Sequence, residues 1–214
     1  MGIWSDEVVP RATDLLLDTA EIRHLRKETV GALRGDVLEI GFGSGLNLAF
    51  YRPEVRRVLA VEPSTVAARL AARRIASARV PVEIVGSDAQ VLGVESSSVD
   101  AAVSTFTLCT IPDPSAALQE LLRVLRPGGT LRFLEHGLAR RAPVARWQRR
   151  LNPLQRHVAA GCQLDRPIDR LVEEAGFSLG DLRNLWLPGP RVLRPFGYLY
   201  LGSATKPATT TPTG

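Results

Sequence analysis

Short apolar runs alternate along the chain with segments whose apolar residues recur at helical spacing. The runs are nearly continuous, which is typical of strands in a sheet that is covered on both faces. Strands that alternate with helices predict a doubly wound, mostly parallel sheet with helices on both sides. The predicted central strands are residues 37–40, 58–61, 82–85, 99–104 and 130–134.

Helix signals fill the intervals between these strands. Ser64 is placed to cap a helix over 66–76. Asp113, followed by Pro114, begins a helix over 116–125. The remaining predictions are helices over 15–30, 46–51 and 169–175, and two strands over 177–187 and 193–201 that form an antiparallel edge.

A length of 214 residues suits one domain. We expect that domain over 1–202, with an amino-terminal helix at about 10–30, a core at about 36–135 and a lid-like insertion at about 136–164. Residues 203–214 contain no large apolar side chain, so they predict a disordered tail.

Basic side chains exceed acidic ones by 27 to 22, and all but two of the basic ones are arginines. Arginine pairs with phosphate and carboxylate groups, which leaves nucleic acid, anionic membrane and acidic small molecules open as partners. A bias toward arginine codons gives the same count. Six of the arginines lie between 136 and 164, an interval without a single acidic residue.

The same interval carries an apolar stripe at helical spacing, which Pro153 must break or kink. The stripe favours an amphipathic cover with solvated arginines. A second interpretation is a lid that also contacts an anionic membrane surface. The stripe consists of Trp147, Leu151, Leu154 and Val158.

Cysteine and histidine are scarce. Cys109 and Cys162 lie 53 positions apart, and the chain has only three histidines. This argues against a disulfide framework and a structural zinc site, so we expect no metal and assign both cysteines to packing. No apolar run approaches the ~18 residues that span a bilayer, which favours a cytoplasmic protein, at most peripheral to a membrane.

The strongest motif is a strand that runs into three closely spaced glycines, VLEIGFGSG at 37–45. Glycines at such a turn allow a ligand to lie against bare backbone at the carboxyl edge of a parallel sheet. A dinucleotide fingerprint needs its third glycine where this chain has Leu46, which disfavours an NAD-dependent oxidoreductase.

Three acidic residues mark successive strands. Glu39 lies inside an otherwise apolar strand, where a carboxylate needs a donor or a cation. Glu62, at the end of the second strand, is placed to accept from both ribose hydroxyls, and Asp88, after the third, from an adenine amino group. Together they predict a nucleoside site. The set of Gly41, Gly43, Gly45, Glu62 and Asp88 argues against a module that has lost its activity.

These motifs, with 124–129 (VLRPGG), resemble those of class I S-adenosylmethionine-dependent methyltransferases over roughly 36–135. The resemblance implies a Rossmann-like fold and S-adenosylmethionine as the cofactor. It places the three glycines at the methionine portion, Glu62 at the ribose, Asp88 and Ala89 at the adenine, and Thr105 and Phe106 over the cofactor. The predicted cofactor residues are Glu39, Gly41, Phe42, Gly43, Gly45, Asn47, Glu62, Pro63, Ser64, Asp88, Ala89, Thr105 and Phe106.

Beyond this core, as far as residue 177, the sequence resembles more narrowly the methyltransferase-like family whose animal members methylate alkyl thiols. Those members carry an apolar amino-terminal membrane anchor, which this sequence does not show. The resemblance implies a small, partly apolar acceptor such as a thiol, held by His136, Trp147 and Asn152. It rests on 135–136 (EH), 147–148 (WQ), 152–153 (NP), 161–162 (GC), Arg166 and 175–177 (AGF).

His136 is the candidate catalytic residue because it follows the fifth strand and a histidine titrates near neutrality. The alternative is a polar residue that only bonds a neighbouring loop. A thiol acceptor, with a pKa near 8.5, needs only a modest base or a nearby positive charge.

Other acceptors stay open. They are a lipid or secondary metabolite methylated on oxygen or nitrogen, and a nucleic acid. The fourth strand is not followed by the Asn/Asp-Pro-Pro-aromatic tetrad that base-modifying enzymes use, and the arginine-rich interval has few aromatic residues for stacking. We therefore expect a small-molecule partner and no nucleic acid.

Overall fold

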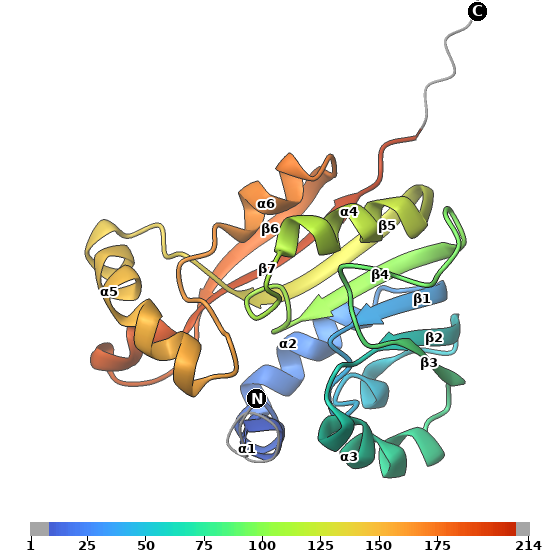
Figure 1. Cartoon of the computed structure of the whole chain (residues 1–214), viewed down its shortest axis with the longest axis horizontal. Helices are drawn as coiled ribbons and strands as arrows, with labels where there is room; N and C mark the ends of the chain where they lie inside the picture. The colour runs from blue at the N-terminus through green and yellow to red at the C-terminus, as the bar shows by residue number, and fades with distance from the viewer. Residues whose placement is uncertain (1–8, 209–214) are drawn as a thin grey trace, which may run out of the picture.

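The computed structural model describes residues 9–208 and contains one seven-stranded sheet (Figure 1). The strand order is β3-β2-β1-β4-β5-β7-β6, and β7 alone runs antiparallel to its neighbours. The antiparallel strand therefore lies one position in from the edge strand β6. The strands are β1 (Gly35–Ile40), β2 (Val55–Val61), β3 (Val82–Gly86), β4 (Val99–Thr105), β5 (Leu125–His136), β6 (Ser178–Trp186) and β7 (Tyr198–Thr205).

Helices cover both faces, as the nearly continuous apolar strands predict. On one face, Leu38 and Ile40 join a core with residues of α4 and α6; on the other, Val37 joins a core with residues of α2 and α3. Side chains alternate along a strand, so Glu39 points to the same face as Val37, toward α2. The helical elements are α1 (Val9–Leu16), α2 (Ala20–Val30), η2 (Leu48–Phe50), α3 (Thr65–Ala76), α4 (Pro114–Val124), α5 (Ala142–Val158), α6 (Ile168–Glu174) and η3 (Arg191–Phe196).

Two predicted helix caps are confirmed. The Ser64 hydroxyl accepts from the Ala67 amide at 3.2 Å, and Asp113 accepts from the Ser115 and Ala116 amides at 3.0 Å. Each cap satisfies amides that have no partner inside the helix, at the end where the chain enters from a strand.

Two helix predictions are wrong in extent. The helix expected over 15–30 is interrupted, because α1 ends at Leu16 and Thr19 caps a new helix, α2. The segment 46–51 forms only the short 3₁₀ helix η2. Its side chains are bonded to the sheet instead, as described below.

Two strand predictions also need correction. The strand predicted over 130–134 is longer, because β5 begins at Leu125 and includes Pro127–Gly129, where its register against β4 shifts. Residues 193–196 belong to η3, while β7 starts at Tyr198 and continues through Thr205. Ser203–Thr205 therefore pair with β5 and are not part of a tail. Of the predicted tail, 209–214 lie outside the described residues.

None of the helices in the described range, 9–208, has the length and apolar character needed to cross a membrane.

Candidate functional site

The carboxyl ends of β1 and β2 meet at the glycine turn. Glu62, at the end of β2, accepts hydrogen bonds from the amides of Gly43 at 2.6 Å and Ser64 at 2.7 Å. Partial burial raises the pKa of this carboxyl, while the two amides oppose the shift. Because each carboxylate oxygen can accept a further hydrogen bond, Glu62 still has capacity for a ligand's hydroxyls.

Two positions of the turn, 41 and 43, favour glycine for different reasons. A Cβ on Gly41 would lie 2.0 Å from the Thr107 hydroxyl oxygen, so this glycine is required by the protein's own packing. A Cβ on Gly43 would meet only the Gly41 carbonyl, at 3.9 Å, and otherwise open space. Gly43 therefore leaves room for a ligand beside Glu62. Gly41 and Gly43 both have positive φ, at 65° and 58°.

The buried Glu39 finds its donors within the protein. Its carboxylate accepts from the Asn47 amide nitrogen at 2.8 Å and from the Tyr51 hydroxyl at 2.6 Å. Burial at 1% exposure raises the pKa of Glu39 to about 7 against these two hydrogen bonds. A cationic ligand is therefore not needed as its direct partner. Asn47, a predicted cofactor residue, joins Glu39 to Thr105, whose hydroxyl lies 3.1 Å from the same amide nitrogen.

Arg26 of α2 completes this network and was missed in the sequence. It donates to Asn47 at 3.0 Å and to Thr105 at 2.9 Å, and its guanidinium lies 5.4 Å from the centre of the Phe106 ring. Burial lowers its pKa, although Glu39 opposes the shift. The available signal was its position four residues after Ile22, on the buried face of α2.

The outer part of the predicted cofactor site is more exposed. Asp88 accepts from the amide of Gln90 at 2.8 Å and from its side chain at 3.0 Å, which lowers its pKa. Pro63 is also exposed. Ala89 and Phe42 lie in the two cores and contribute packing.

Phe106 adopts an unusual backbone conformation just after β4. Its φ is 56°, a value that costs energy for a residue with a side chain and that tends to occur at functional sites. Its amide donates to the Leu134 carbonyl at 2.8 Å, and its ring contacts His136 edge-on at 5.2 Å. The strained residue thus lies between the predicted cofactor edge and the predicted catalytic histidine.

Glu135 organises the loop that follows. It is fully buried and accepts from the amides of Thr107 at 2.9 Å and Cys109 at 3.3 Å, and from the Ser104 hydroxyl at 2.6 Å. Burial raises its pKa, and these hydrogen bonds oppose the shift. Glu135 precedes His136 in β5, so one strand end fixes both the loop and the histidine.

The two cysteines, which we expected only to pack, lie side by side beside His136. The two Sγ atoms are 3.7 Å apart, and Cys162 Sγ is 3.8 Å from His136 Nδ1. Both thiols are free. Contact with Cys109, and then His136, lowers the pKa of Cys162. Residues 53 positions apart are brought together by the fold, and no local pattern could have shown it.

The face of α5 that packs against the rest of the protein is not the apolar stripe that the sequence predicts to be buried. Trp147 is 55% exposed and Leu154 64% exposed, whereas Gln148 and Asn152 are buried. Because Trp147 is exposed and does not share the buried face of the helix with these two residues, the structure does not bring it to the site. The helix is not broken at Pro153, which lies inside it.

Asn152 positions the loop that contains Cys162. Its side chain donates to Asp165 at 2.7 Å and accepts from the Leu164 amide at 2.8 Å. Gln148, one turn earlier, accepts from the Ala139 amide and donates to the Gly137 carbonyl. These bonds attach α5 to the segment after His136 and to the loop that contains Cys162.

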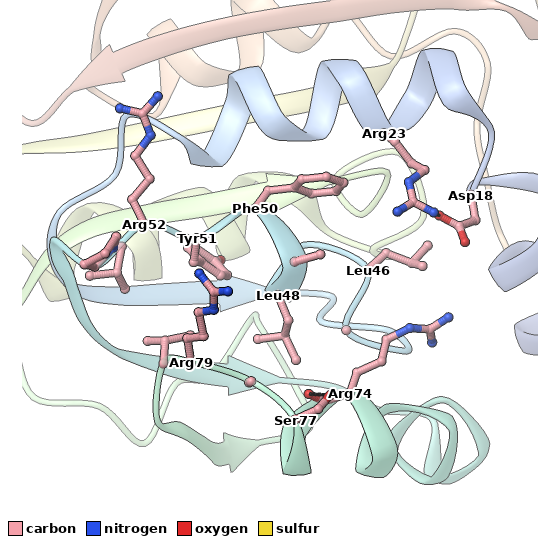
Figure 2. Close-up of a pocket in the computed structure, with 16 residues that line it drawn as sticks. Asp18, Arg23, Leu46, Leu48, Phe50, Tyr51, Arg52, Arg74, Ser77 and Arg79 are labelled. Carbon is pink, nitrogen blue, oxygen red and sulfur yellow. Dashed lines mark hydrogen bonds and ion pairs between the residues drawn. The ribbon is translucent and has the colours of Figure 1, made fainter.

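A cavity of about 740 Å³ lies beside η2 and the end of α3 (Figure 2). It reaches the turn only at Gly45 and Leu46. Arg74, on its rim, pairs with Asp14 of α1 at 3.0 Å and donates to the Ser44 carbonyl. The cavity is therefore distinct from the edge where Glu62 and Asp88 lie, and we do not assign the nucleoside to it.

The residues at the edge fit S-adenosylmethionine. Gly43 leaves open space beside the backbone, Glu62 has free acceptor capacity for a ribose, and Asp88 is an exposed acceptor farther out. When bound, this group supplies a methyl group activated by its sulfonium charge.

Comparisons with known proteins agree with this fit. A family model described as a methyltransferase domain matches residues 38–133. Thiol S-methyltransferase TMT1B of Rattus norvegicus is 36% identical over 174 residues, 79% of this chain and 70% of the relative. Thiol S-methyltransferase TMT1A of Homo sapiens is 33% identical over 169 residues, 77% of this chain and 69% of the relative.

The solved structure of a proposed methyltransferase from Bacillus halodurans has the same fold. Its TM-score is 0.70 at 18% identity, over 86% of this chain and 98% of its own. Fold and sequence together define a class I S-adenosylmethionine-dependent methyltransferase with a Rossmann-like sheet. The chain belongs to the methyltransferase family that contains the thiol S-methyltransferases TMT1A and TMT1B.

Proposed function

We propose that this methyltransferase transfers the methyl group to a small, partly apolar thiol. The observation that carries the proposal is the length of the likeness to the thiol S-methyltransferases. Those alignments extend over 169–174 residues, well beyond the matched domain at 38–133. They therefore include segments outside the common core, where acceptor selection is expected.

The part of the sheet edge around Phe106, His136 and Cys162, called the acceptor edge below, suits such a substrate. Phe106 offers an apolar ring that contacts His136, and Cys162 lies on His136 in turn. In methyl transfer the electrophile is already activated, so the protein contributes mainly positioning, exclusion of water and a deprotonated acceptor. A thiol loses its proton more readily than an alcohol, which matches a site with few strong bases.

A turnover assay with alkyl thiols, phenols, amines and lipid headgroups tests the proposal, with S-adenosylhomocysteine as the measured product. We expect the highest kcat/KM with thiols. Turnover restricted to phenols, amines or headgroups would overturn the acceptor. Thermal shift with S-adenosylhomocysteine and NADH provides a parallel check, and stabilisation by NADH alone would contradict the methyltransferase.

Two variants separate the cofactor edge from the acceptor edge. Glu62→Ala should weaken S-adenosylhomocysteine binding about 10- to 100-fold, because it removes charge-assisted hydrogen bonds. His136→Ala should leave that affinity within about twofold and lower turnover roughly 10²-fold. Glu83→Ala, an exposed acid on β3, is the control for both. Equal loss of binding in the two variants would place His136 in the cofactor pocket.

We also propose that the outer face of α5 and η3 rests on an anionic membrane surface, with the protein itself in the cytoplasm. The two helices pack against each other, and their exposed apolar residues are Trp147, Leu154 and Val158 on α5 and Val192 and Leu193 on η3. The same two helices carry exposed arginines, among them Arg149 and Arg150 of α5 and Arg191 of η3. Apolar side chains among arginines match a surface of anionic lipid.

Co-sedimentation with vesicles tests this contact. We expect binding to vesicles that contain phosphatidylglycerol and little binding to pure phosphatidylcholine. The double variant Trp147→Ser/Leu154→Ser should lose most of the bound fraction, whereas Ile84→Ser, which changes another exposed apolar residue on β3, should not. Equal binding by both variants would overturn the surface, and RNA binding that is lost with added salt would favour a nucleic-acid partner.

A further inference from the structure

Cys109, Cys162 and His136 form a cluster of three soft donors. Their ligand atoms all lie within 4.8 Å of one another. The cysteines are buried and His136 is partly exposed. None of these side chains is used to hold Glu39, Glu62 or the glycine turn, so the cofactor edge does not explain the cluster.

Two of the three distances match the edges of a tetrahedral zinc site, and the third, between Cys109 Sγ and the His136 ring nitrogen, is within 4.8 Å. With Zn–S near 2.3 Å and Zn–N near 2.0–2.1 Å, a tetrahedron requires roughly 3.8 Å between two sulfurs and about 3.6 Å between sulfur and nitrogen. The observed separations are 3.7 Å for Cys109 and Cys162 and 3.8 Å for Cys162 and His136 Nδ1. A disulfide would need a sulfur–sulfur distance of about 2.0 Å.

Main-chain contacts hold the cluster in place. Gln163 donates its amide to the Cys109 carbonyl at 2.8 Å, which ties the two cysteine segments together. Glu135 accepts from the Cys109 amide and precedes His136 in the same strand. Before Cys162, Ala160 and Gly161 both have positive φ, 46° and 87°, and turn the chain sharply out of α5. Donors fixed in this way need little reorganisation to bind a metal ion.

We propose that Cys109, Cys162 and His136 bind one Zn²⁺ ion, and that the fourth tetrahedral position receives the acceptor thiol as its thiolate. The second half of this inference rests on the proposed function, whereas metal binding itself does not. Three protein ligands with one open position are typical of catalytic zinc, and a thiol bound to zinc is deprotonated.

Charge and proton balance support the arrangement. Two thiolates and a neutral imidazole neutralise Zn²⁺, and an acceptor thiolate makes the site singly negative. Arg166 is buried and donates to the Leu108 carbonyl, next to Cys109, and its charge interacts favourably with both cysteine sulfurs. The acceptor's proton leaves to solvent on binding. The thiolate lone pair then forms the new S–C bond, while the sulfonium S–CH₃ bond breaks and its electron pair stays on the departing sulfur.

Metal content and cobalt spectroscopy test the site on the full chain, reduced and stripped with a chelator. We expect one Zn²⁺ per chain after reloading. With Co²⁺ we expect a thiolate charge-transfer band and intense visible bands typical of tetrahedral cobalt.

Cys162→Ser and His136→Ala should each lower zinc affinity at least about tenfold. His157→Ala, an exposed histidine on α5, is the matched control. Circular dichroism identifies variants that fail to fold, and His136→Ala, whose side chain is partly exposed, keeps the test valid if Cys162→Ser does not fold.

The outcomes separate this inference from the proposed function. A change in the Co²⁺ bands on adding an alkyl monothiol supports the open position, and unchanged bands would overturn it. Full thiol turnover by zinc-free protein would overturn the zinc role while leaving the thiol substrate in place. Zinc binding without turnover of any thiol would leave the metal site and contradict the substrate. No stoichiometric zinc, or a Cys109–Cys162 disulfide as the stable state under reducing conditions, would overturn the site.

Discussion

Two buried glutamates organise the two halves of the sheet's carboxyl edge in different ways. Glu39 in β1 is held by side chains, those of Asn47 and Tyr51. Glu135 in β5 is held mainly by main-chain amides of the loop that follows β4. The hydrogen bonds that hold Glu39 therefore depend on which side chains face it. Those that hold Glu135 depend on the path of the backbone, and this carboxylate shapes the loop that carries Cys109.

This contrast predicts its largest effect at Glu135. Glu135→Ala leaves several buried amides without an acceptor, so we expect a loss of about 4 kcal/mol in the free energy of unfolding. Urea denaturation measures it. Glu83→Ala, on an exposed part of β3, should change stability by about 0.5 kcal/mol or less. Similar small losses in both variants would mean that the loop keeps its path without the carboxylate.

The second effect is pH-dependent and belongs to Glu39. Its folded-state pKa of about 7 lies above the ordinary 4.5, so the folded protein holds this proton more tightly than the unfolded chain does. The resulting stabilisation is complete below pH 4.5 and is lost as pH rises through 7. The groups that face the carboxyl are Arg26 from α2, Tyr51 after η2 and Glu62 at the end of β2.

Glu39→Gln should remove this dependence. Between pH 4.5 and 8, wild type should lose up to about 3 kcal/mol relative to the variant. Urea unfolding of both proteins across that range isolates the difference, since other titrating groups are common to both. Parallel pH profiles would show that Arg26 keeps Glu39 ionised throughout.

The smallest effects compare single donors. Tyr51→Phe removes one of the two side-chain donors to Glu39 and should cost about 1–2 kcal/mol. Ser104→Ala removes a hydroxyl from Glu135, which keeps its main-chain amides, and should cost about 1 kcal/mol or less. Thermal denaturation at pH 8 measures both. A larger loss for Ser104→Ala would reverse the contrast between the two carboxylates.

Much of the cofactor half was predictable because its signals are local. Glycines next to a strand and an acid at a strand end follow from the geometry of a parallel sheet, and the structure places Glu62 and Gly43 in contact. The donors of Glu39 were not predictable. Asn47 and Tyr51 reach it only because 46–51 forms a short 3₁₀ segment where a regular helix was expected.

The acceptor half was less predictable because it depends on distant residues. Periodicity located a helix around Trp147 but could not show which face is buried, and the buried face holds the polar residues Gln148 and Asn152. The pairing of Cys109 with Cys162 requires the loops after β4 and α5 to meet. Likewise, Ser203–Thr205 looks like a polar tail in sequence and becomes a strand because β5 offers it a partner.

The position of β7 between β5 and β6 also sets an order of events during synthesis. Among the described strands, β6 is hydrogen-bonded to β7 alone, yet it leaves the ribosome first. Its amides and carbonyls therefore remain unpaired until Tyr198–Thr205 emerges, and β5 lacks its second neighbour for the same interval. Strands β1 to β4 can pair earlier. The half that carries His136 is consequently the last part of the sheet to close and the part most exposed to misfolding in the nascent chain.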